Sequence, residues 1–265
     1  MITNHAPFMR RLRTALGKPA DEKRMKNQFP HLFSSPDNTE TLARTGNRTR
    51  QEQLALIDIL EENGKAINLQ IHIVESRSEA ADVIIDLIRS KDPEFSHTKH
   101  VIMHDHPDLA ELDLWKRFTR EAVTTHTSFS SDRQLREKTC ASFIGITAPC
   151  LGVADSATVI EVTSPDRPRS TSLVPSIHIA FLRRQRLVAD LAEAFALLAH
   201  EGLPDSFVCI SGPSKTADIE AHMVHGAHGP REMHLVLLSE PAAAQPEMLS
   251  APLDSVDSAA GEDTT

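Results

Sequence analysis

The residues with the clearest potential for chemistry gather in one stretch of the chain, residues 207–238. A β-prone apolar run breaks there at Gly212, Pro213 and Ser214, and a helix-compatible segment follows directly. Ser214 is a favourable N-cap for such a helix, and the backbone N–H groups of a turn before a helix can hold an anion. The pattern therefore predicts an anion-binding turn.

Two carboxylates, Asp218 and Glu220, follow this turn and are the candidates for acid/base catalysis. Residues two apart on a helix do not share a face, so each carboxylate would act alone, by binding substrate or orienting another group. The alternative is an ordinary capped helix with solvated carboxylates. Lys215 and Thr216 do not complete a nucleotide P-loop, because Ser214 stands where that motif needs glycine.

Two arginines, Arg167 and Arg169, lie in a proline-rich loop directly before an apolar run. A guanidinium held in a rigid loop can bind a carboxylate or phosphate through two hydrogen bonds. His178, on the strand expected next, could supply a functional imidazole. The alternatives are a solvated basic loop and a buried histidine that is satisfied by its neighbours.

Histidines form two further clusters. His222, His225 and His228 follow an HxxHxxH spacing, and on a continuous helix the first two could share a metal ion. Glycines interrupt this segment and no fourth ligand is evident, so we predict no metal here and keep the three histidines as the alternative. Residues 104–106, His-Asp-His, follow a strand, where adjacent side chains point to opposite faces.

Composition narrows the class of protein. The 265 residues are 40% hydrophobic and carry a net charge of -9, which disfavours broad binding to nucleic acid or anionic membranes. No apolar run is long enough to span a membrane and the N-terminus does not resemble a signal peptide, so we expect a cytoplasmic protein. Cys140, Cys150 and Cys209 are scattered and lack the spacing of iron–sulfur ligands.

The order of segments predicts an α/β fold. Residues 1–50 resemble an N-terminal arm with a short helix at about residues 8–16, residues 51–239 an α/β domain, and residues 240–265 a disordered acidic tail. Helices alternate with strands, which predicts a mainly parallel sheet with helices on both faces and an inserted β-hairpin around residues 158–162. Ligands in such sheets usually bind beyond the carboxyl ends of the strands.

Four sequence elements carry a resemblance to a known family: FIGIT, RPRSTSLVPSIHIAF, ISGPSKTADIE and VHGAHGPREMHLVLL. Together they resemble the LutC/YkgG-type lactate-utilisation proteins, which contain the LUD domain, most closely over residues 143–238. The resemblance implies a fold similar to the NagB/RpiA/CoA-transferase group. It also implies a role in a three-component system that oxidises L-lactate to pyruvate, in which partner subunits carry the iron–sulfur clusters.

The chain departs from the family pattern at one loop. The family usually has Thr-Gly-Thr after an alanine and an acidic residue, whereas this chain has Ser156, Ala157 and Thr158. Ser156 keeps a hydroxyl group. Ala157 would close a backbone approach to a ligand or disfavour a positive φ at this position.

We therefore expect a subunit of a lactate-oxidising complex that binds no cofactor itself, and that binds an anionic ligand or a redox partner. The expected ligand-binding residues are Arg169, Ser170, His178, Gly212, Pro213, Ser214 and Thr216. One alternative is a stand-alone enzyme of the sugar-phosphate isomerase or CoA-transferase kind that uses Asp218 or Glu220. Another is a non-catalytic assembly protein.

Overall fold

The protein is described from a computed structural model, which covers residues 5–20, 27, 37–94, 96–118, 122–217, 223–225 and 228–239. The chain divides into two units, Met1–Thr39 and Glu40–Thr265, and each is described by itself. In the first unit, α1 spans His5–Ala15, where the sequence predicts a short helix. The predicted acidic tail lies outside the described residues, and the domain boundaries stay predictions.

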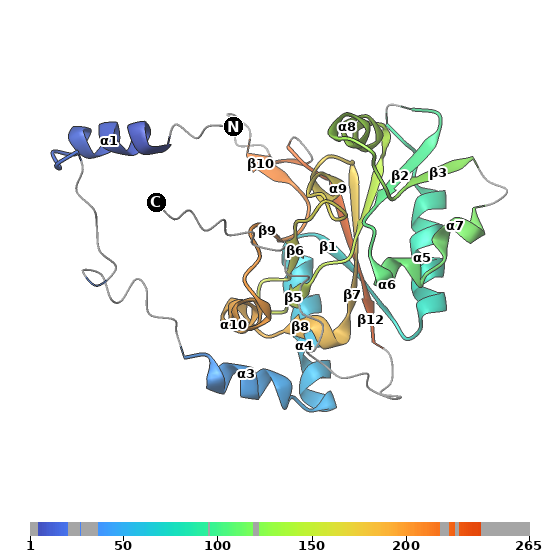
Figure 1. The fold of residues 1–265 in the computed structure, drawn as a ribbon. Helices are drawn as coiled ribbons and strands as arrows, with labels where there is room; N and C mark the ends of the chain where they lie inside the picture. The colour runs from blue at the N-terminus through green and yellow to red at the C-terminus, as the bar shows by residue number, and fades with distance from the viewer. Residues whose placement is uncertain are drawn as a thin grey trace. The chain divides into compact units, whose positions relative to one another are not determined.

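A parallel sheet forms the centre of the second unit (Figure 1). Its six strands lie in the order β1, β12, β7, β4, β2, β3, and every neighbouring pair is parallel. The α/β class with a mainly parallel sheet is thus confirmed. The strands are β1 (Leu69–Val74), β2 (Lys99–Met103), β3 (Val123–His126), β4 (Ile144–Thr147), β7 (Ile177–Arg183) and β12 (Glu232–Leu238).

The helices begin where the sequence supplies caps. Thr49 and Glu52 form a complete capping box at the start of α4, and the Ser76 and Ser131 side chains cap α5 and α8. The helices of the second unit are α3 (Thr39–Gly46), α4 (Arg50–Ala66), α5 (Arg77–Ser90), α6 (Pro107–Ala110), α7 (Leu114–Arg117), α8 (Asp132–Ala141), α9 (Ser170–Leu173), a short 3₁₀ helix (Arg184–Arg186) and α10 (Leu191–Glu201).

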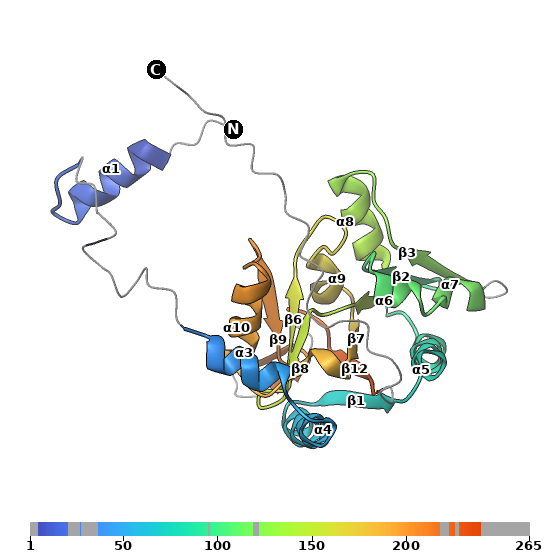
Figure 2. The same ribbon diagram turned by 60° about the horizontal axis from the view of Figure 1, so that its bottom comes forward.

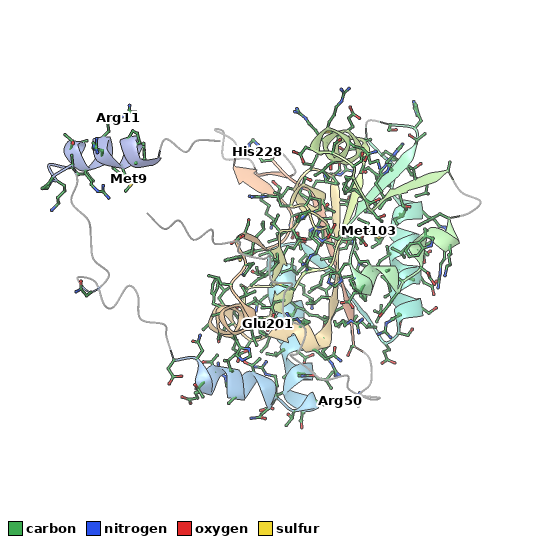
Figure 3. All side chains as sticks on the ribbon, in the orientation of Figure 1. Met9, Arg11, Arg50, Met103, Glu201 and His228 are labelled. Carbon is green, nitrogen blue, oxygen red and sulfur yellow. The ribbon has the colours of Figure 1, made fainter. Side chains whose placement is uncertain are left out.

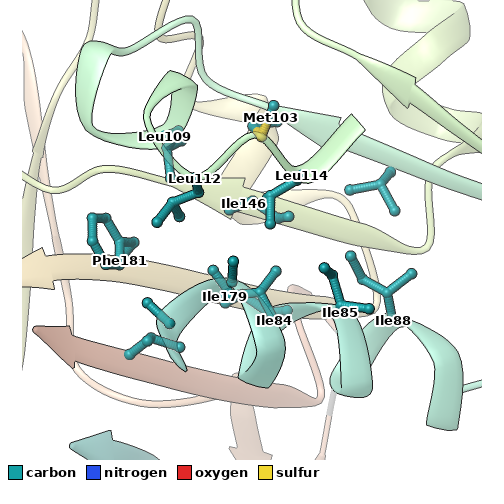
Figure 4. Close-up of a cluster of buried hydrophobic side chains, with 14 of the residues drawn as sticks. Ile84, Ile85, Ile88, Met103, Leu109, Leu112, Leu114, Ile146, Ile179 and Phe181 are labelled. Carbon is teal, nitrogen blue, oxygen red and sulfur yellow. The ribbon is translucent and has the colours of Figure 1, made fainter. Parts of the chain in front are cut away.

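An apolar cluster fills the space between α5 and the sheet (Figure 4). Ile84, Ile85 and Ile88 project from α5 onto Ile146, Ile179 and Phe181 of the sheet, and Leu109, Leu112 and Leu114 close the cluster from the segment of α6 and α7. We call this group the α5 cluster. Its side chains are almost completely buried, as expected for the main hydrophobic contribution to stability.

A second sheet covers the opposite face of the first (Figure 2). The predicted hairpin is confirmed as β5 (Leu151–Val153) and β6 (Thr158–Val162), and the strands β8 (Leu187–Val188) and β9 (Phe207–Ile210) extend it in the order β8, β5, β6, β9. One face of this sheet packs with α4 against the parallel sheet, and the other packs against α10.

Two segments differ from the predictions. The prediction of a helix after Ser214 is wrong. Lys215–Ala217 instead form strand β10, which pairs antiparallel with β11 (Met223–His225). The apolar spacing of residues 109–118 likewise predicts one helix, whereas the structure has the shorter α6 and α7 there. Among the described residues, none of the helices has the length and apolar content needed to cross a membrane.

Candidate functional site

The turn at Gly212, Pro213 and Ser214 is fixed against a second turn that precedes β12. The Ser214 N–H donates to the Pro230 carbonyl at 2.8 Å. Gly212 has a φ of 75°, and a Cβ placed there would come within 2.8 Å of the Ile67 carbonyl oxygen. Both the positive φ and the close contact explain why glycine occupies this position.

This turn lies at the amino ends of the parallel strands. Ile67 precedes β1 and Pro230 precedes β12, so the turn is at the opposite edge of the sheet from the carboxyl ends, where we expected ligand sites. Ser214 caps no helix, and its N–H is already donated to Pro230, which leaves one donor fewer for an anion. A role of this turn in ligand binding stays a prediction.

Helix α9 carries the predicted residues Arg169 and Ser170 at its start. Arg169 is exposed, whereas the Ser170 Oγ is buried and has no hydrogen-bond partner among the described residues. Gly145 of β4 allows α9 to lie directly on the sheet, because a Cβ there would come within 1.8 Å of the Thr171 carbonyl oxygen. Helix α9 therefore packs directly against β4.

His178 lies between the two sheets. Along β7, Ile177 and Ile179 face the α5 cluster, so His178 points to the other side, toward the second sheet. Its Nε2 lies 2.8 Å from Thr147 Oγ1 and 3.2 Å from Glu161 Oε1, while its Nδ1 has no hydrogen-bond partner among the described residues. The predicted functional imidazole is thus buried between the sheets, in contact with a hydroxyl and a carboxylate.

Glu161 is the charged centre of this group. Burial raises its pKa, but the hydrogen bond and positive charge of His178, with smaller contributions from His104 and Thr147, outweigh burial and bring the pKa down to about 2. Glu161 is therefore ionised at neutral pH although only 3% of it is exposed. We call His104, Thr147, Glu161 and His178 the interlayer cluster.

His104 completes the cluster from the carboxyl end of β2. Burial lowers its pKa to about 4, against the opposing charge of Glu161, so the ring is neutral at neutral pH. The Pro168 carbonyl lies close enough to favour the protonated ring. Neither ring nitrogen, however, makes a hydrogen bond of good geometry with any described residue, although only 2% of His104 is exposed.

His104 also lines an open pocket of about 270 Å³ at the carboxyl ends of β2 and β3. We call it the His104 pocket. Its other lining residues are Met103, Asp105, His106, Ala110, Trp115, Thr125 and Thr127. This is the edge of a parallel sheet where ligands are usually bound.

The interlayer cluster and α9 share a chemical property. Nδ1 of His178 and the hydroxyls of Ser170 and Thr171 are buried without hydrogen-bond partners among the described residues, and neither nitrogen of His104 makes a hydrogen bond of good geometry there. Buried polar atoms in folded proteins are nearly always paired with protein groups, water or a ligand. This group can therefore donate to and accept from a small polar molecule or ordered water.

Several predicted residues lie elsewhere. Asp218, Glu220 and His222 are outside the described residues, and Thr216 and His225 lie in β10 and β11, where only the backbone is described. His228 is exposed beside β10 (Figure 3). Within the part of the chain that the structure describes, no three His, Cys, Asp or Glu side chains are arranged to hold a metal ion.

The sequence reasoning overlooked Glu161 and Thr147. A signal for Glu161 was present, since it is the one charged residue in the β-prone run at residues 158–162 and faces the same side as the apolar Val159. Of the two expectations for Ala157, a blocked approach to a ligand stays a prediction, and the expectation that alanine avoids a positive φ here is wrong. Ala157 adopts a φ of 46°, the conformation that glycine prefers, and its side chain is fully buried in the apolar layer between the sheets.

Comparison with known proteins decides the family. The LUD domain model matches residues 57–238, which is most of the chain. The chain belongs to the LUD domain family. Lactate utilization protein C of Exiguobacterium sp. is 30% identical over 249 residues, which cover 90% of this chain and 97% of that protein. Lactate utilization protein C of Shouchella clausii is 30% identical over 246 residues, covering 91% of this chain and all of the relative.

A solved structure is also similar. The crystal structure of a DUF162 family protein from Deinococcus radiodurans matches 70% of this LUD protein and 98% of its own chain, with a TM-score of 0.46 and 15% sequence identity. The family assignment rests on the domain match and on the relatives in sequence.

Proposed function

We propose that this LUD protein is a subunit of a system that oxidises L-lactate to pyruvate. Its role in lactate utilisation is supported by relatives named lactate utilization protein C that align along nearly the whole chain. The finer parts of the proposal are that the subunit binds a small anionic ligand and that its partners supply the redox centres.

The observation that carries the ligand-binding part is the group of buried polar atoms without partners around α9 and the interlayer cluster. An ionised Glu161 between two sheets is expensive to desolvate, and apolar residues of similar volume would often be as stable or more stable there. Such a group is better explained by a polar ligand than by folding alone. Arg167 supplies positive charge near His104, whose pKa it lowers.

The iron–sulfur clusters belong to partner subunits in this proposal, and this chain holds no cofactor. Cys140 lies in α8, Cys150 directly before β5 and Cys209 in β9, so the three cysteines are distributed over separate elements. Cluster ligation needs several thiolates around one centre. The subunit would therefore act by binding the ligand, the partners or both.

Growth on L-lactate tests the role in the system. Cells without this chain should fail to grow on L-lactate and grow normally on pyruvate, and the restored chain should recover lactate growth. Anaerobic purification of the tagged chain should yield a coloured assembly with cysteine-rich partners. Normal lactate growth without the chain would contradict the proposal, and turnover of a sugar phosphate or CoA ester by the isolated chain would favour the enzyme alternative.

A further inference from the structure

Helix α1 carries a stripe of exposed apolar side chains. Phe8 and Leu12 lie one turn apart, and the Leu16 N–H donates to the Leu12 carbonyl at 3.0 Å, which continues the helical spacing one residue beyond the end of α1. The exposed fractions of Phe8, Leu12 and Leu16 are 58%, 40% and 63%. Residues four apart share one face of a helix, so the three side chains form one apolar stripe, which we call the α1 stripe.

Positive charge flanks the α1 stripe on both sides. Arg11 precedes Leu12 and Arg13 follows it, and successive residues of a helix are turned by about 100°, so the two arginines lie on either side of the stripe. Figure 3 shows Met9 and Arg11 projecting from opposite sides of α1. Residues 1–20 contain four lysine or arginine side chains and no carboxylate side chain. Helix α1 is therefore amphipathic and basic.

The second unit of the chain has the opposite charge. The 265 residues carry a net charge of -9 in spite of the cations in and around α1. An anionic surface therefore repels the second unit and attracts α1, which confines contact with such a surface to this helix. The division of the chain agrees with this separation, since α1 belongs to Met1–Thr39 and the parallel sheet belongs to Glu40–Thr265.

We propose that α1 binds to the surface of a membrane that contains anionic lipids. The α1 stripe enters the boundary between headgroups and acyl chains, while Arg11 and Arg13 extend sideways to the lipid phosphates. Three apolar side chains bury far less than the roughly 800 Å² per partner of a stable protein–protein interface. On an anionic bilayer, attraction of each arginine adds to this small apolar contribution. The inference is independent of the proposed role in lactate utilisation.

Sedimentation of the purified full chain with lipid vesicles tests the proposal. The chain should sediment with vesicles made of equal parts phosphatidylglycerol and phosphatidylcholine. It should bind about tenfold or more weakly to vesicles of phosphatidylcholine alone, because the attraction of the cations is then absent. Raising the salt concentration from about 50 mM to about 300 mM should weaken binding to the anionic vesicles by about fivefold, since salt screens that attraction.

Substitutions in α1 separate the apolar contribution from the charge. Leu12→Ser removes an apolar side chain from the α1 stripe and should weaken binding to the anionic vesicles by about tenfold. The double variant Arg11→Gln, Arg13→Gln should weaken it by about tenfold or more and reduce its salt dependence. Leu203→Ser is the matched control, because Leu203 is 66% exposed but lies in the second unit, and it should bind as the wild type does.

A fluorescent side chain in the stripe shows whether α1 enters the bilayer. The emission of the Phe8→Trp variant should shift to shorter wavelength on the anionic vesicles and be quenched by brominated acyl chains. The wild type, in which Trp115 is the only tryptophan, should show neither change. Emission that stays as in water would show that α1 does not enter the apolar boundary, and would overturn the proposed mode of binding.

The other outcomes are equally decisive. No sedimentation with anionic vesicles at about 1 mM lipid would overturn the proposal, and so would binding that Leu203→Ser weakens as much as Leu12→Ser does. If the chain ignores vesicles while Leu12→Ser releases a protein that copurifies with the wild type, α1 binds a protein partner and no membrane. None of these results touches the role in lactate utilisation, which fails only on normal lactate growth without the chain.

Discussion

The two sides of the parallel sheet are built differently. The α5 cluster is a closely packed group of aliphatic and aromatic side chains. The interlayer cluster on the other side has an ionised Glu161 paired with His178, and His104 with both nitrogens unpaired, at a similar degree of burial. The two sides therefore reach the same burial in different ways. The α5 cluster buries apolar surface, which stabilises the fold, whereas the interlayer cluster buries a carboxylate that its neighbours keep ionised.

The largest effect should follow from removing the His178 contact of the buried Glu161. His178→Leu leaves Glu161 buried without its partner and should lower the free energy of unfolding by about 3–5 kcal/mol. The double variant Glu161→Leu, His178→Leu removes both charges at similar volume and should regain most of this loss. Urea unfolding measures both, and a double variant as unstable as the single one would show that the pair itself stabilises the fold.

A truncation in the α5 cluster should lower stability in a way that a second substitution in the interlayer cluster does not reverse. Ile84→Ala should lower the free energy of unfolding by about 2–5 kcal/mol, because it leaves a cavity in a fully buried apolar region. Adding Glu161→Leu to it should bring no recovery, since the two sites lie on opposite faces and share no contact in their clusters. Growth on L-lactate below the unfolding temperature of the variant should be unchanged, and poorer growth would argue against separate roles of the two clusters.

Acid should lower the stability of the protein through buried histidines on both faces of the parallel sheet. Burial lowers the pKa of His104, and that of His234 on the α5 side, to about 4, below the ordinary histidine value of 6.5. The folded state then binds protons more weakly than the unfolded state, so this stability is complete above pH 6.5 and lost as the pH falls toward 4. For His104 the shift corresponds to about 3 kcal/mol.

Urea unfolding at pH 7 and at pH 5 tests this dependence. His104→Gln should unfold with a smaller difference between the two pH values than the wild type, and His234→Gln serves as the matched variant on the other face. An unchanged difference in both variants would mean that other groups control acid unfolding. Glu161 changes the pH dependence of stability only at lower pH, because its stabilising charge is lost as the pH falls from 4.5 to about 2.

The smallest effect is expected where α9 meets the sheet. Gly145→Ala places a methyl group against the Thr171 carbonyl and should lower stability by about 1–3 kcal/mol, since the short α9 can move outward. Gly46→Ala, at a position with open space around it, is the matched control. If both substitutions were equally mild, α9 would not be held as closely as the structure describes.

Local sequence patterns predicted much of the fold because the relevant forces act locally. Alternating helices and apolar runs indicated the parallel sheet, and Ser76 and Ser131, whose residue type is favoured at N-caps, cap α5 and α8 in the structure. The same patterns predicted a helix from Lys215, where pairing with β11 instead makes a strand. Which strands pair across long sequence separations is set by packing, which a local pattern does not contain.

The candidate site was predicted less completely for the same reason. His178 was identified, but its partners Glu161 and Thr147 lie 17 and 31 positions away and come from two other strands. The turn at Gly212 drew attention through its residue types, and the structure places it at the other edge of the sheet from the His104 pocket. Residue types showed where chemistry was possible, and only the packing of the two sheets showed which groups meet.

The most direct test of the account is growth on L-lactate by cells whose only copy of this chain is the Glu161→Leu, His178→Leu double variant. The account predicts normal amounts of folded protein, measured by immunoblot and solubility, together with a loss of growth on L-lactate and normal growth on pyruvate. Normal growth on L-lactate would contradict it, because the buried polar cluster would then serve neither folding nor lactate utilisation.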